Sequence, residues 1–67
     1  MNDALWKDCV QDIIKQANEV KAEPESEERT WKLLTYAEVL SSIQSYAIPI
    51  GPETIGLDFD IDERYLN

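Results

Sequence analysis

Few side chains in this 67-residue sequence could do covalent chemistry. There is one cysteine, Cys9, and no histidine. A Ser, Cys or Thr nucleophile needs a neighbouring base, which is most often histidine. One cysteine also excludes an internal disulfide and a zinc site built from Cys and His ligands. Neither Gly51 nor Gly56 is followed by the Lys-Ser/Thr pair of a phosphate-binding loop. We therefore expect no catalytic residue, no cofactor and no metal ligand.

The densest group of carboxylates lies near the C-terminal end, at Asp58, Asp60, Asp62 and Glu63. Paired carboxylates act as acid and base when burial moves their pKa values apart, but nothing in the sequence indicates a pocket around these four. Asp-x-Asp-x-Asp also opens a calcium-binding loop, which needs glycine at its sixth position. That position holds Glu63. We expect a solvated acidic edge rather than an enzyme site or a specific calcium site.

The charge balance limits the class of partner. Fourteen acidic residues against six basic ones give a formal net charge of −8. Such a charge repels the phosphates of nucleic acids and anionic membrane surfaces. We expect no direct binding to DNA or RNA, and a protein partner with a basic surface instead. In composition, the chain resembles small acidic accessory proteins of phages and mobile elements.

No segment is typical of a membrane span or of a secretory signal. The longest uncharged stretch, Val39–Pro52, contains three serines and a glutamine, whereas a spanning helix needs about 20 mainly apolar residues. Asp3 stands where a signal peptide carries basic residues, and no apolar run follows it. Together with the unpaired cysteine, this predicts a reducing, cytoplasmic location.

Two stretches have the spacing of amphipathic helices, and we expect both to belong to one small domain, residues 1–67. The first helix should run from residue 3 to about 22, because Pro24 disfavours helical geometry just before it. The second should run from about 27 to 47, capped by Ser26 and ended by Pro49. The sequence Thr35-Tyr36-Ala37-Glu38 has the order of a capping box, so a corner at Thr35 is the alternative to one continuous helix. The apolar pattern passes through Thr35 in phase and favours the continuous helix.

The apolar stripes of these helices predict the core. In the first helix Cys9 should be buried as a small hydrophobe, with a reactive or intermolecularly bridging thiol as the alternative. Trp6 should anchor the core, with a binding hot spot as the alternative. Trp31 in the second helix suits a core position and a binding hot spot equally well. The first stripe contains Leu5, Cys9, Ile13, Ala17 and Val20, flanked by Trp6, Val10 and Ile14. The second contains Leu33, Tyr36, Leu40, Ile43 and Ala47, flanked by Val39 and Tyr46.

Residues 48–67 change in character. Turn-forming Ile48-Pro49-Ile50-Gly51-Pro52 is followed by a strict alternation of apolar and acidic residues from Leu57 to Asp62. A period of two is typical of extended backbone, with Leu57, Phe59 and Ile61 on one side and three aspartates on the other. Aspartate is a poor strand former, so a β-strand and an irregular docked arm both stay open.

The expected fold is therefore all-α, an antiparallel two-helix hairpin followed by an extended acidic arm. The stripes are wider than one partner helix can cover. We expect the arm to fold back over the hairpin, and a second copy to complete a four-helix bundle as a homodimer.

The expected function is that of a small non-enzymatic protein-binding module, an adaptor, regulator or inhibitor that occupies its partner's surface. Its candidate binding residues are Trp31, Asp58, Asp60, Asp62 and Glu63. One alternative is a nucleic-acid mimic, in which the three aspartates form a row about 6.6 Å apart that a basic protein would bind. The other alternative is a structural assembly component.

Overall fold

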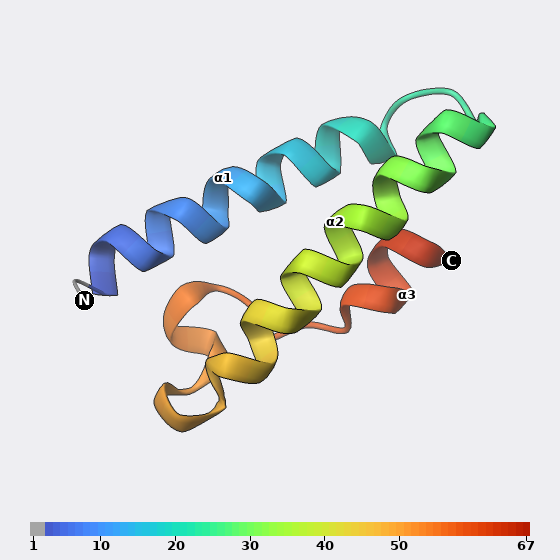
Figure 1. The fold of residues 1–67 in the computed structure, drawn as a ribbon. Helices are drawn as coiled ribbons and strands as arrows, with labels where there is room; N and C mark the ends of the chain where they lie inside the picture. Colours follow the sequence, from blue (N-terminus) through green and yellow to red (C-terminus); the bar gives the residue numbers. More distant parts are fainter. Residues whose placement is uncertain (1–2) are drawn as a thin grey trace.

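The structure, a computed structural model, describes residues 3–67. This part of the chain forms helices and no strand: α1 (Asp3–Lys21), α2 (Glu27–Tyr46), two short 3-10 helices η1 (Ile48–Ile50) and η2 (Pro52–Ile55), and α3 (Ile61–Leu66). Helices α1 and α2 run antiparallel from the loop at residues 22–26 and diverge toward their other ends (Figure 1). The predicted helical hairpin is confirmed.

Local signals in the sequence account for the start and the continuity of α2. The Ser26 hydroxyl accepts a hydrogen bond from the Arg29 backbone N–H at 3.0 Å, and Glu27 and Glu28 lie near the positive end of the helix dipole. The helix continues through Thr35, whose hydroxyl donates to the Trp31 carbonyl at 3.0 Å instead of capping a new helix. The continuous second helix is therefore confirmed.

The tail, residues 48–67, differs from the predicted extended arm. It forms η1, η2 and α3, with only a short irregular stretch between η2 and α3. An isolated strand would leave its backbone amides without partners, and α3 satisfies them within itself. The Asp60 carboxylate starts α3 by accepting from the Glu63 N–H at 3.1 Å. Ile61 and Tyr65, four residues apart, are then buried on one side of α3.

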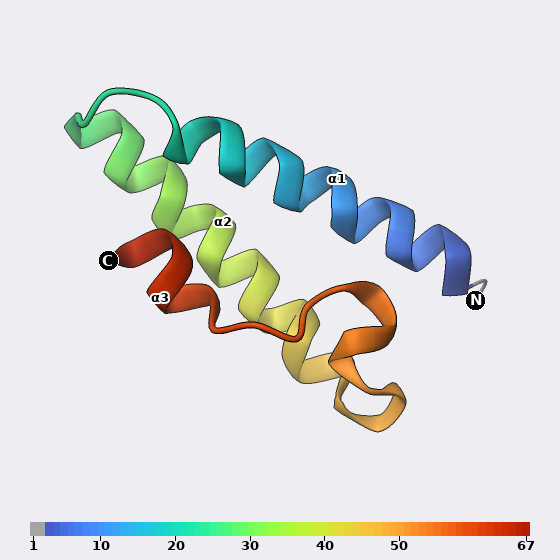
Figure 2. The same cartoon turned by 180° about the vertical axis from the view of Figure 1, so that it is seen from behind.

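The tail lies against one face of the hairpin (Figure 2). The Gln44 amide donates to the carbonyls of Leu57 at 2.6 Å and Phe59 at 3.0 Å, and the Tyr65 hydroxyl donates to Asn18 Oδ1 at 2.8 Å. The expectation that the last segment folds back over the hairpin is thus confirmed. The core between them contains Val10, Ile14, Ala17, Val20, Leu33, Ala37, Leu40, Ala47, Ile55, Leu57, Ile61 and Tyr65.

The buried line of α1 is displaced from the predicted stripe. Cys9 is exposed, so its predicted burial is wrong, and Trp6 is 38% exposed rather than a buried anchor. Helix α1 is turned so that Val10 and Ile14 enter the core, while the neighbouring Gln11 amide reaches the Ile55 carbonyl of η2 at 3.5 Å. The tail thus contacts α1 beside Val10 and Ile14, and periodicity alone did not show which part of the apolar stripe would be buried.

The buried residues of α2 also differ from the predicted stripe. Ala37 is buried, whereas Val39 and Tyr46 are exposed at 43% and 87%. None of the helices in the described residues is long and apolar enough to cross a membrane.

Candidate binding groove between α2 and α3

A hollow of about 490 Å³ lies between α2 and α3, and we call it the α2–α3 groove. Helix α2 contributes residues at the spacing of one helix face, and α3 contributes two residues four apart. The lining residues are Leu34, Ala37, Glu38, Ser41, Ser42, Asp62 and Leu66. The groove thus depends on α3, the element that the sequence pattern did not predict.

The groove combines an apolar interior with acidic side chains. Ala37 is fully buried, Leu34 is half-buried and Leu66 is 43% exposed. Glu38 and Asp62 bring one carboxylate from each helix, and both side chains are exposed. Ser41 and Ser42 are small and leave room. Such a lining suits a side chain with an apolar stem and a cationic end, as lysine and arginine have.

Trp31 extends this surface along α2 toward the loop. It precedes Leu34 by three residues and Glu38 by seven, so the three share one side of the helix. Its side chain is 63% exposed, which excludes the core role, because a core anchor would be buried. A large exposed aromatic ring beside a hollow is typical of a binding hot spot.

The other predicted site residues do not form an even row. Asp58, Asp60 and Glu63 are exposed, but the Asp60 carboxylate is engaged as the cap of α3. The guanidinium carbon of Arg64 lies 3.7 Å from the ring centroid of Phe59, which places a positive charge within the acidic segment. The strand spacing of about 6.6 Å between alternate aspartates is absent, because Asp62 belongs to a helix.

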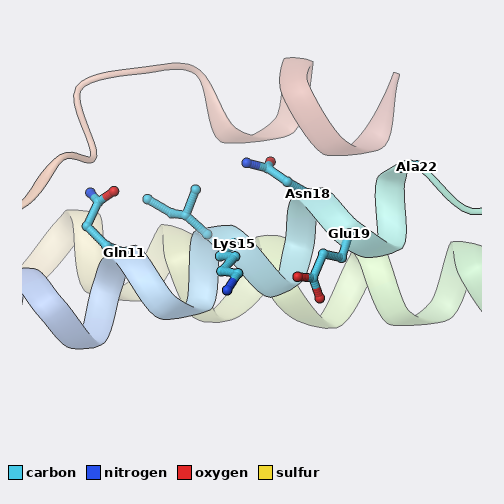
Figure 3. A pocket seen from close by; sticks show the side chains of 6 residues that line it. Gln11, Lys15, Asn18, Glu19 and Ala22 are labelled. Carbon is cyan, nitrogen blue, oxygen red and sulfur yellow. The ribbon is translucent and has the colours of Figure 1, made fainter.

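A second hollow, of about 400 Å³, runs along α1 beside the tail. Figure 3 shows Gln11 and Asn18 pointing toward the tail, and Lys15 and Glu19 pointing away from it. Both amide side chains are engaged there, Gln11 with the Ile55 carbonyl and Asn18 with the Tyr65 hydroxyl. This hollow is the seam along which the tail closes on α1.

The sequence did not single out Leu34, Glu38 or Leu66 as site residues. Glu38 belongs to the capping-box sequence, and its spacing of seven residues from Trp31 already places both on one side of the helix. One signal for α3 was present, because Asp60-Ile61-Asp62-Glu63 has the cap-x-x-Glu order of a helix start.

Within residues 3–67, no group of three or more Cys, Asp or Glu side chains is arranged to hold a metal ion. Comparison with family models, curated proteins and solved structures gives no match for this chain.

Proposed function

We propose that this protein is a small non-enzymatic protein-binding module, whose α2–α3 groove and adjacent Trp31 dock a basic, partly apolar segment of a partner protein. One observation carries the proposal. A hollow with apolar walls and two carboxylates lies on the same side of α2 as a tryptophan that is 63% exposed. A nucleic-acid mimic and a structural assembly component are also compatible with the charge, but no contact in residues 3–67 favours either of them.

Each part of this surface has a separate physical role. Trp31 supplies apolar area, because covering an exposed aromatic ring removes up to about 150–250 Å² from water. Glu38 and Asp62 orient the segment by pairing with its lysine or arginine side chains. The net charge of −8 attracts a basic partner from a distance and raises the association rate, an effect that weakens as salt screens it.

The test uses a synthetic amphipathic helix of leucine and lysine as the probe, and its leucine–glutamate counterpart as the peptide control. A Trp6→Phe variant leaves Trp31 as the single tryptophan, so its fluorescence reports on this surface. We expect the lysine peptide to shift Trp31 emission to shorter wavelength, and the glutamate peptide to leave it unchanged.

Replacing both carboxylates, Glu38→Gln with Asp62→Asn, should weaken binding of the lysine peptide about tenfold, because two exposed ion pairs contribute up to about 1 kcal/mol each. The matched control, Asp8→Asn with Glu19→Gln, removes the same charge from exposed positions on α1 and should change the affinity far less. Equal weakening in both variants would show that net charge, and not the groove, binds the peptide. No response of Trp31 to the peptide would contradict the proposal.

A further inference from the structure

The hairpin has a second face, opposite the tail, that no other part of residues 3–67 covers. Figure 2 shows the tail in front of α2, and in Figure 1 the tail lies behind it. At 100° per residue, Leu5, Cys9 and Ile13 lie about 140–180° round α1 from Asn18, which the tail contacts. We define the open face as these three residues of α1 together with Tyr36, Val39, Ile43 and Tyr46 of α2.

The open face is apolar and in part strongly exposed. Leu5 is 58% exposed, Cys9 is also exposed, and Ile13 and Ile43 are half-buried at the floor of the face. The Tyr36 hydroxyl donates to Gln16 Oε1 at 3.2 Å, which joins α1 to α2 across it. The α1 part and the α2 part of the open face are therefore linked and form one continuous surface.

We propose that the open face binds the same face of a second copy, giving a two-fold symmetric dimer with a four-helix core. The seven residues include no Asp, Glu, Lys or Arg, so two copies of this face can pack together without bringing like-charged carboxylates or amines into direct contact. A basic partner, in contrast, would find no carboxylate among them. The groove proposed above and the open face thus suit partners of different chemistry.

The molecule is large enough on this side to form a dimer interface with a second copy. It measures 37 × 18 × 14 Å, so its broad side is of the order of the ~800 Å² per subunit that a stable interface buries. Association would also stabilise the fold. A domain of this size obtains little stability from its own core, and small domains often gain further stability by forming oligomers. Burial of Leu5, Val39 and Tyr46 would supply that gain.

The test measures the molar mass of the full chain by sedimentation equilibrium, at protein concentrations from about 1 to 500 µM. We expect the mass to rise from 7.7 kDa to twice that value. Each copy carries −8, so added salt should strengthen the dimer by screening the repulsion. Binding of the lysine peptide to the groove should instead weaken with salt, and failure of one proposal is therefore distinguishable from failure of the other.

Val39→Asp places a charge in the centre of the open face and should keep the chain at 7.7 kDa over the whole range. Its matched control is Ser45→Asp, which adds the same charge to α2 at an exposed position about 120° away and should still dimerise. Circular dichroism checks that both variants keep their helices. If Val39→Asp unfolds the chain, Tyr46→Ser, at an 87% exposed position, replaces it. A native chain of 7.7 kDa at every concentration, or dimers unaffected by substitutions in the open face, would overturn the proposal.

Discussion

The two faces of the hairpin differ in what covers them, although both carry large apolar side chains. On the covered face, Leu57 and Tyr65 from the tail are fully buried, and the polar groups beside them pair across the junction, as Gln44 does with two tail carbonyls. On the open face, Leu5 and Val39 stay exposed. Helical periodicity thus marks which residues are apolar, while a third element decides which of them become core.

The largest effect should come from truncating the tail where it enters the core. Leu57→Ala removes a fully buried side chain and should lower the free energy of unfolding by about 2–5 kcal/mol. The counterpart on the open face, Val39→Ala, should change it by less than about 0.5 kcal/mol. Urea unfolding of dilute, monomeric protein measures both. Equal losses would mean that the two faces are not distinguished by burial.

A smaller effect should follow from removing the amide that ties the tail to α2. Gln44→Met keeps the length of the side chain but leaves the carbonyls of Leu57 and Phe59 without their donor, at a cost of about 1–3 kcal/mol. The control Thr30→Val removes a hydroxyl that donates only to the Ser26 carbonyl at an exposed position, and should cost under about 0.5 kcal/mol. Faster hydrogen exchange in α3, found for Gln44→Met alone, would locate the loss in the tail.

The smallest effect concerns an exposed ion pair of α2. A hydrogen bond from Lys32 to Glu28, at 3.3 Å, and the charge of Glu28 raise the pKa of the Lys32 amine above its ordinary 10.5. Because the pKa is raised on folding, the pair contributes its full stabilisation below pH 10.5 and loses it as the pH rises through the higher folded-state pKa. Glu28→Gln should return the pKa toward 10.5, as followed by NMR titration of the lysine side chain. Glu27→Gln, which removes the same charge one residue away, should leave it nearly unchanged.

The sequence predicted the hairpin better than the tail, for a physical reason. Ser26 and Pro24 act through neighbouring atoms, so the bounds of α1 and α2 followed from local chemistry to within one residue. The alternation from Leu57 to Asp62 suits a strand and a docked helix start alike, and the choice depended on contacts with Gln44, distant in sequence. Asp60-x-x-Glu63 is a helix-start signal, but the alternation of apolar and acidic residues covers the same positions and favoured an extended arm.

The candidate site, too, could be predicted only where local sequence determines it. Exposure of Trp31 was one of two outcomes that the sequence left open. The groove beside it could not be predicted, because Asp62 and Glu38 line one hollow only after α3 has formed and packed on α2. The predicted burial of Cys9 and Trp6 failed likewise, because the side of α1 that enters the core carries Val10 and Ile14.

The bond between Tyr65 and Asn18 joins residues 47 positions apart, and this separation has a consequence for refolding. The contacts between α1 and α2 beside their loop join residues much closer in sequence, and short loops close at a lower cost in entropy. We therefore expect the hairpin to pair before the tail docks, which leaves the covered face bare for that interval. Where two refolding chains lie close together, the tail of one can close on the hairpin of the other, which would trap an intertwined pair by domain swapping. Protein concentration during refolding therefore becomes a factor in the yield of correctly closed protein.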